Sequence, residues 1–222
     1  MLLQNAIKNF ALLSLLLSFY LAKGQETSVR AKGYYSSDFV IDGIARNISF
    51  YIPAGYNNNG PTPVVFVLHD AGEAGKTVIK KYGNSFERLA DSSACIVVYP
   101  DAVNGRWSAK MGGTNAGDTI NDVGFVSIMI DYFVQQYNGN SARVFVAGFY
   151  NGGDLAWRLG CDAPKRVTAI APFISSVDEA KKNCTPSIPF FNAEKYTATA
   201  NKKLSYSALS AAWNFLLQQN RQ

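Results

Sequence analysis

The chain has 222 residues, of which 48% are hydrophobic and 17% charged, and its formal net charge is +5 at pH 7. This composition excludes a disordered chain and allows one domain with a substantial core. The basic residues are scattered rather than gathered in a stripe, so the charge does not indicate nucleic-acid binding. No repeat, low-complexity tract or linker divides the sequence.

The first two dozen residues predict a signal peptide. Lys8 precedes an apolar run at residues 10–21 (FALLSLLLSFYL), and Ala22 and Gly24 place small residues where a signal peptidase reads them. The run is shorter than the roughly 20 residues that a membrane-spanning helix needs, although an uncleaved anchor is the alternative. We expect cleavage before Gln25. This would leave a secreted or periplasmic single domain, residues 25–222, with no membrane span.

The N-terminal half predicts a hairpin, then two buried strands with a helix between them. Residues 39–41 and 44–52 form the hairpin around Asp42-Gly43, because this dipeptide tolerates the positive φ angles of a tight turn. The continuous apolar runs at residues 64–68 (VVFVL) and 95–99 (CIVVY) are typical of strands covered on both faces. We expect a helix at residues 76–89, interrupted at Gly83, and a strand end at Pro100.

The C-terminal half continues this alternation. Residues 124–137 predict a helix with one apolar face, formed by Phe125, Ile128, Met129, Tyr132 and Phe133. The remaining expected strands are residues 143–147, 167–174 and 188–191, and the remaining helices are residues 152–159 and 204–219. Buried strands that alternate with helices predict an α/β fold, with a mostly parallel sheet covered by helices on both faces.

Three cysteines in an exported protein suggest one disulfide and one free thiol. Cys95 opens an apolar strand and is expected to be a buried hydrophobic residue. Cys161 and Cys184 lie in looser flanking segments and form the better pair, worth roughly 3 kcal/mol of stability. A catalytic thiol is a poor alternative, since it needs a neighbouring histidine and the chain has one.

The segment at residues 143–158 (RVFVAGFYNGGDLAWR) has the layout of a nucleophile elbow. In the pattern G-x-S-x-G, a sharp turn between a strand and a helix exposes a serine above the sheet. Tyr150 stands at the serine position. A phenol has a pKa near 10, so Tyr150 would need a strong neighbouring base or cation to attack an ester at neutral pH.

Several blocks in a common order resemble secreted polyhydroxybutyrate depolymerase-like and feruloyl esterase-like α/β-hydrolases. The blocks are residues 49–56 (SFYIPAGY), 67–70 (VLHD), 98–102 (VYPDA), 105–107 (GRW), 121–125 (NDVGF) and 143–153 (RVFVAGFYNGG). The resemblance implies an α/β-hydrolase-like fold with an antiparallel N-terminal hairpin, and ester hydrolysis by a Ser-His-Asp triad. It also places Cys161 and Cys184 where these proteins often carry a cystine.

The chain differs from this family at the positions of the catalytic residues. The base histidine of an α/β-hydrolase follows the nucleophile, but His69 is the sole histidine and precedes Tyr150. Asn192 or Glu194 could stand near the acid position, and no motif fixes either one. Asp70 replaces the family's glycine, and a carboxylate there would oppose a developing oxyanion.

Three functional hypotheses follow. The first is a non-catalytic esterase homologue that binds a carbohydrate, an ester polymer or a partner protein. Its cleft would be lined by Trp107, Tyr82, Tyr150 and Asn151. The second is an active carboxylic-ester hydrolase with an unusual site of Tyr150, His69 and Asp70. In the third the aromatic side chains close the cleft and the role is structural or an interaction role.

We expect no cofactor and no metal site, because the chain lacks ligand clusters with metal-binding spacing. The Gly-rich segment at residues 112–118 follows no strand and lacks a phosphate-binding lysine, so it is expected to be a surface loop. The sequence does not indicate an oligomeric state.

Overall fold

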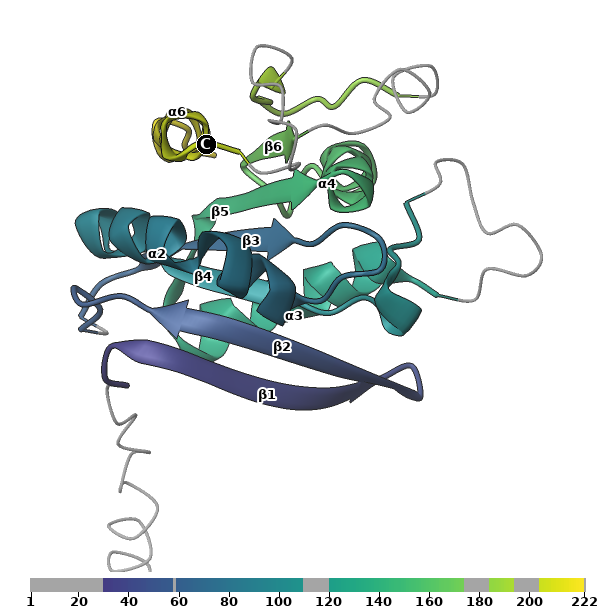
Figure 1. The fold of residues 1–222 in the computed structure, drawn as a ribbon, viewed down its shortest axis with the longest axis horizontal. Coiled ribbons are helices and arrows are strands. Elements are labelled where there is room, and N and C mark those ends of the chain that lie inside the picture. The colour runs from purple at the N-terminus through teal and green to yellow at the C-terminus, as the bar shows by residue number, and fades with distance from the viewer. Residues whose placement is uncertain (1–29, 58, 110–119, 174–183, 194–203, 222) are drawn as a thin grey trace, which may run out of the picture.

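A computed structural model describes residues 30–57, 59–109, 120–173, 184–193 and 204–221. They form one six-stranded sheet with helices packed on both faces, which confirms the α/β fold (Figure 1). The predicted signal peptide and the Gly-rich segment at residues 112–118 lie outside the described residues, as does Glu194.

The sheet has the strand order β1-β2-β4-β3-β5-β6. The β1–β2 and β2–β4 pairs are antiparallel, and the β3–β4, β3–β5 and β5–β6 pairs are parallel. The sheet is therefore mostly parallel and begins with an antiparallel hairpin, as predicted. The strands are β1 (Gly33–Ile41), β2 (Ile44–Ile52), β3 (Thr62–Leu68), β4 (Ile96–Pro100), β5 (Gly139–Phe149) and β6 (Ala169–Phe173).

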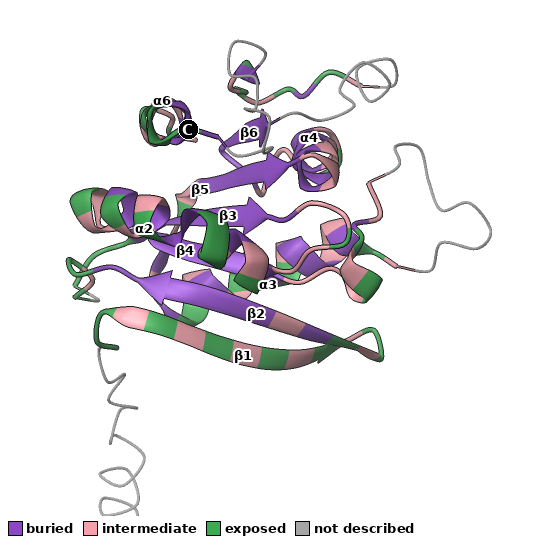
Figure 2. Cartoon of the chain, viewed as in Figure 1, coloured by how far each residue is buried: buried purple, intermediate pink, exposed green. Residues whose placement is uncertain are grey.

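The hairpin turn is confirmed, since Asp42 and Gly43 have φ angles of 53° and 74°. Strand β1 is longer than predicted and starts at Gly33, opposite Ile52. It is an edge strand whose residues alternate between partly buried and exposed, as Figure 2 shows. Because it contains several polar residues, the sequence has no continuous apolar run that would predict the whole strand.

Strand β5 begins at Gly139 rather than at residue 143, β6 begins at Ala169 rather than at residue 167, and two further strand predictions were wrong. Pro100 belongs to β4 and pairs with Ile48, so the proline does not end the strand before itself. Residues 188–191 form no full strand; a single bridge joins Phe190 to Ile170. Ile174, the last residue of another predicted strand, lies outside the described residues.

The helices are α2 (Gly75–Ser93), α3 (Asp122–Gln136), α4 (Asn151–Asp162) and α6 (Tyr206–Leu217), and a 3₁₀ turn, η1, spans Val103–Gly105. The prediction that Gly83 interrupts its helix was wrong. Gly83 lies inside α2 and is buried, and a Cβ there would lie 3.1 Å from the hydroxyl of Tyr34. Glycine thus lets β1 and α2 approach each other.

The inward face predicted for α3 is partly wrong. Phe125, Met129 and Phe133 are buried as expected, but Ile130 is buried in place of Ile128, which is 43% exposed. Apolar residues surround much of this helix, so periodicity alone does not identify the side that meets the sheet.

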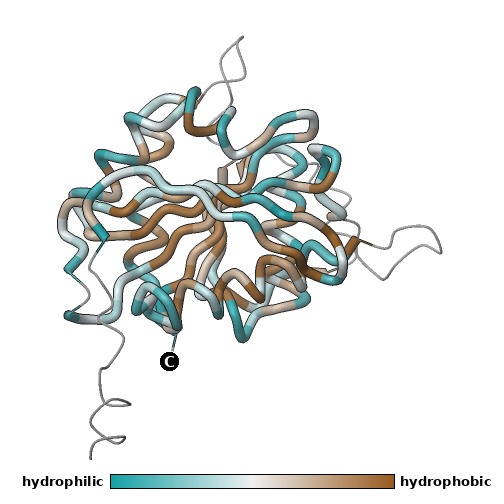
Figure 3. Tube along the Cα trace, turned by 90° about the horizontal axis from the view of Figure 1, so that it is seen from below, coloured by the Kyte–Doolittle hydropathy of each residue, from teal (hydrophilic) through white to brown (hydrophobic). Residues whose placement is uncertain are grey.

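Each face of the sheet carries its own core. Alternate residues of the strands pack with α3 and α4 on one face, and the intervening residues pack with α2 and α6 on the other. Phe66 belongs to the first core, whereas Val65 and Val67 belong to the second. Figure 3 shows the hydrophobic residues gathered along the central strands.

Cys161 on α4 forms a disulfide with Cys184, and Cys95 is a buried free thiol, as the sequence suggested. Within the described part of the chain, no helix combines the length and the apolar character needed to cross a membrane.

Candidate functional site

Tyr150 stands at a sharp turn between β5 and α4. It has φ 48° and ψ −112°, and it precedes the first helical residue, Asn151. Neighbouring glycines make the turn sterically possible. A Cβ on Gly148 would lie 2.1 Å from the carbonyl oxygen of Gly152, and a Cβ on Gly152 would lie 2.5 Å from that of His69. A non-glycine residue with this backbone is strained, and such strain is typical of functional turns.

The backbone of Tyr150 is fixed by hydrogen bonds on both sides. Its N–H donates to the Phe173 carbonyl at 2.9 Å, and its carbonyl accepts from the Asp154 N–H at 3.0 Å. The side chain is part-exposed and packs against the core beneath α2 and α6. Partial burial, then the negative charge of Asp70, raise the pKa of the Tyr150 phenol. The phenol is therefore neutral near pH 7.

His69 follows β3 and is completely buried. Its Nε2 accepts from the Ala102 N–H at 3.0 Å, so its Nδ1 carries the proton and donates to the Asp70 carbonyl at 2.7 Å. Burial lowers the pKa of the imidazole, which favours the neutral ring. The histidine joins the loop after β3 to the loop after β4, and both ring nitrogens bond to backbone.

Trp107 packs against this histidine. Its indole Nε1 donates to the His69 carbonyl at 2.9 Å, the two ring centroids lie 4.8 Å apart, and the Trp107 residue is only 2% exposed. The Asn151 side chain bonds twice to the Trp107 backbone, accepting from its N–H at 2.8 Å and donating to its carbonyl at 3.2 Å. In this structure Trp107 and Asn151 therefore hold the loop after β4 against the elbow, and the indole offers no open face.

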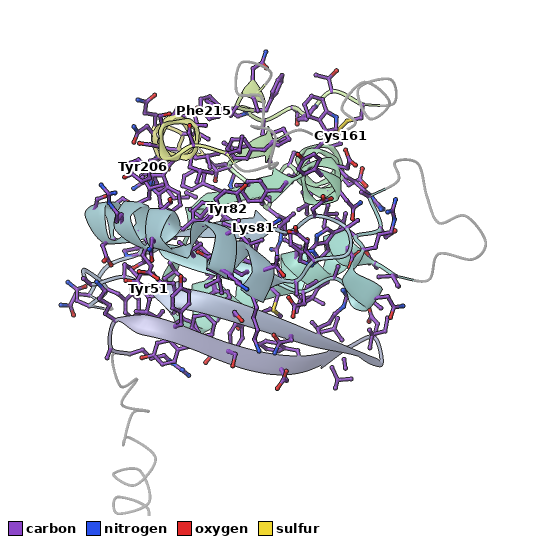
Figure 4. All side chains as sticks on the ribbon, in the orientation of Figure 1. Tyr51, Lys81, Tyr82, Cys161, Tyr206 and Phe215 are labelled. Carbon is purple, nitrogen blue, oxygen red and sulfur yellow. A yellow bond between two sulfur atoms is a disulfide. The ribbon has the colours of Figure 1, made fainter. Side chains whose placement is uncertain are left out.

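Tyr82 also lies in a packed environment. It is 5% exposed, its ring stacks on Phe149 at 4.9 Å between centroids, and its hydroxyl accepts from the Leu204 N–H at 3.1 Å. The preceding Lys81 forms an ion pair with Glu73, and Figure 4 shows Lys81 and Tyr82 adjacent on α2. Of the three aromatic residues predicted to line a cleft, Tyr150 alone is part-exposed.

The Asp70 carboxylate accepts hydrogen bonds from two backbone N–H groups at the elbow, those of Ala71 and Asn151. Its Oδ1 accepts from the Ala71 N–H at 2.6 Å and from the Asn151 N–H at 3.3 Å. In the elbow arrangement, the oxyanion hole consists of the N–H after the nucleophile and an N–H from the loop after β3. Asn151 and Ala71 hold those two places, and the Asp70 carboxylate oxygen lies between them.

The sequence missed a buried ion pair close to this site. Arg46 Nη1 lies 2.8 Å from Asp122 Oδ1, with the arginine side chain 3% exposed and the carboxylate 0%. Asp122 Oδ2 accepts from the Ser108 N–H at 2.7 Å, next to Trp107. Asp122 lies in a recognisable block, but nothing in the sequence pointed to Arg46 on β2 as its partner. Among the described residues, no group of three or more histidine, cysteine, aspartate or glutamate side chains could hold a metal ion.

No family model matches the chain. By sequence the chain is similar to a bifunctional acetylxylan esterase/xylanase of Neocallimastix patriciarum, with 28% identity over 59% of this chain and 18% of the relative. It is also similar to feruloyl esterase D of Neurospora crassa, with 26% identity over 59% of this chain and 46% of the relative. A poly(3-hydroxybutyrate) depolymerase of Ralstonia pickettii is 29% identical over 52% of this chain and 26% of the relative. The matched regions thus span less than half of each relative's length.

Solved structures agree on the fold. A thermostable esterase superposes with a TM-score of 0.63 over 85% of this chain and 63% of its own, at 17% identity. A poly(3-hydroxybutyrate) depolymerase from Bordetella parapertussis superposes with a TM-score of 0.53 over 64% of this chain and 51% of its own, at 18% identity. The chain therefore has the α/β-hydrolase fold, and its sequence is similar to feruloyl esterases and to a poly(3-hydroxybutyrate) depolymerase.

Proposed function

We propose that this protein is an exported, catalytically inactive relative of these esterases, which uses the fold to bind a ligand or partner. One observation carries the proposal. The sole histidine of the chain is completely buried, and both of its ring nitrogens are bonded to backbone. No imidazole is therefore left to act as general base.

The residue at the nucleophile position supports the same conclusion. Tyr150 would have to lose its proton to attack an ester, and its surroundings raise the pKa of the phenol above the ordinary value of 10.0. The negative charge of Asp70 contributes to this rise and would also repel the anion formed during attack. The alternative, an active hydrolase built on Tyr150, His69 and Asp70, would need the imidazole as its base, and that imidazole is already bonded to backbone.

Export is part of the proposal. The N-terminal sequence has the charge, apolar run and small residues of a cleavable signal peptide, and the Cys161–Cys184 disulfide suits an oxidising compartment.

Turnover of short activated acyl esters and of methyl ferulate tests the proposal. The purified protein is compared with Tyr150→Phe, which keeps the ring and removes the hydroxyl. We expect both proteins to match the background hydrolysis rate. Turnover that Tyr150→Phe abolishes would overturn the proposal and establish a tyrosine-based esterase.

For the ligand we propose a carbohydrate or an ester polymer that contacts the part-exposed ring of Tyr150. Aromatic side chains stack well on sugar rings and other apolar ring faces. Pull-down on insoluble xylan and on poly(3-hydroxybutyrate) granules measures this binding. We expect retention on one of them to fall at least about fivefold in Tyr150→Ala, a loss of about 1 kcal/mol. Equal retention of both proteins would place the binding surface elsewhere.

A further inference from the structure

The Asp70 carboxylate occupies the place at which an ester carbonyl oxygen would be stabilised. Its Oδ1 is the common acceptor of the Ala71 and Asn151 N–H groups, which come from two separate parts of the chain. Hydrogen bonds from N–H groups to a charged acceptor are stronger than those between neutral groups. A substrate carbonyl oxygen would have to displace this carboxylate oxygen to reach the same donors.

The electrostatics favour the internal carboxylate over a neutral competitor. Asn151 is the first residue of the 12-residue helix α4, and a helix N-terminus stabilises negative charge. The carboxylate is also held next to the donors by the chain, so it competes without the entropy cost of binding from solution. The other groups acting on this side of the elbow are Glu73, which adds negative charge, and Lys81, which is paired with it.

We propose that Asp70 is an intramolecular blocking group that closes the elbow to carbonyl and carboxylate ligands. This inference deepens the proposed function and rests on it for the class of ligand. A site with a carboxylate beside Tyr150 can accept hydrogen bonds from a ligand. Its Ala71 and Asn151 N–H groups are already bonded to Asp70, so they are not available to a ligand's carbonyl oxygen. Between the two proposed ligands the site therefore selects the carbohydrate, whose hydroxyl groups donate, over an ester polymer, whose carbonyl groups only accept.

Small carboxylates test the blocking role. The ¹⁵N amide resonances of Ala71 and Asn151 are followed during titration with sodium acetate at constant ionic strength. The proteins compared are the unmodified protein, Asp70→Ala and Asp70→Asn. We expect acetate to shift both amides in Asp70→Ala and in neither of the others, because the amide side chain introduced by Asp70→Asn keeps an oxygen acceptor in place. If Asp70→Ala does not fold, Asp70→Gly replaces it.

Thermal unfolding gives a second readout. Acetate at about ten times its dissociation constant should raise the unfolding midpoint of Asp70→Ala by about 3 to 5 °C. The matched control is Asp101→Ala, because Asp101 Oδ1 accepts from the Gly75 N–H at the start of α2 at 2.6 Å. That variant also loses a carboxylate at a helix N-terminus, but it exposes one N–H donor, that of Gly75, instead of two. We therefore expect acetate to raise its unfolding midpoint less than that of Asp70→Ala.

Three results would overturn the inference. The first is an acetate response in the unmodified protein as large as in Asp70→Ala, and the second is no response in either. The third is equal stabilisation of Asp70→Ala and Asp101→Ala, which would make the response general to helix N-termini. None of these measures ester turnover. A failure of the blocking role is therefore distinguishable from a failure of the proposed function.

Discussion

At the residue scale, His69 connects two loops through hydrogen bonds from its imidazole to backbone groups. Its side chain lies between two loops, accepts from the Ala102 N–H and donates to the Asp70 carbonyl. Its own backbone carbonyl accepts from the Trp107 indole. These three bonds place Asp70 and Trp107 around the elbow, so His69 is a positioning residue.

The protonation of His69 should make stability depend on pH. Burial lowers the imidazole pKa in the folded protein below the ordinary 6.5. Between the lowered pKa and 6.5, the unfolded chain binds a proton that the folded chain does not, so the free energy of unfolding falls as the pH decreases through this window. Urea unfolding at pH 7.5, 6.5 and 5.5 measures the effect.

Since the chain has one histidine, its imidazole resonance is assigned without ambiguity and its titration midpoint can be read by NMR. We expect a midpoint below 6.5 and a smaller pH dependence of stability in the non-titrating variant His69→Gln. A midpoint at or above 6.5 would mean that the imidazole is more accessible to water than the structure indicates.

At the element scale, the β5–α4 turn depends on glycines rather than on the residue at its tip. The Cβ positions of Gly148 and Gly152 would meet backbone atoms, which cannot move aside as a side-chain end can. The turn forms although a tyrosine, Tyr150, and not a serine stands at its tip. Steric demands on the backbone therefore preserve the elbow independently of the chemistry at its tip.

We predict that Gly152→Ala destabilises the protein by about 3 kcal/mol, because its Cβ would lie 2.5 Å from two backbone carbonyl oxygens, those of Leu68 and His69. Chemical denaturation measures the loss. Gly60→Ala is the matched control, since a Cβ there meets nothing within 4 Å and its φ is not positive. We expect a change within about 0.5 kcal/mol for the control. Equal effects of the two substitutions would show that the elbow tolerates a side chain at Gly152.

At the scale of the whole molecule, the disulfide joins residues 184–193 to α4, a helix that packs on one face of the sheet. Cys161 lies on α4, and Cys184 begins the described segment 184–193. The Trp157 indole on the same helix donates to the Cys184 carbonyl at 3.0 Å. The disulfide therefore holds the segment that forms the Ile170–Phe190 bridge at the edge of the sheet.

Removal of this disulfide in Cys161→Ala/Cys184→Ala should cost about 3 kcal/mol and lower the unfolding midpoint by roughly 6 to 12 °C. Scanning calorimetry with and without dithiothreitol measures the change. The reductant should lower the midpoint of the unmodified protein and leave that of the variant unchanged. Burial raises the pKa of the Cys95 thiol to about 11, so it stays protonated and does not exchange with the disulfide. An unmodified protein insensitive to reduction would contradict the stabilising role.

Much of the fold could be read from the sequence, because its strongest signals are local. Continuous apolar runs predicted the central strands, Asp42-Gly43 predicted the hairpin turn, and the glycines around Tyr150 predicted the elbow. The sequence also showed that Tyr150 has no histidine after it, and the resemblance to the esterase family indicated that Asp70 stands where that family has a glycine. The predicted elements depend on local patterns and on the order of residues, which the chain itself determines.

The tertiary structure decided what these residues contact. Tyr34 of a distant strand approaches α2 at Gly83, where a Cβ would crowd its hydroxyl, and Ile128 is exposed because packing turns another side of α3 inward. Trp107 is buried against His69, a contact that no local pattern encodes. Asp70 meets the Asn151 N–H across 81 positions of sequence, because parallel strands bring the loops at their carboxyl ends together. Local patterns determine elements, whereas contacts between distant segments determine which side chains are open to a ligand.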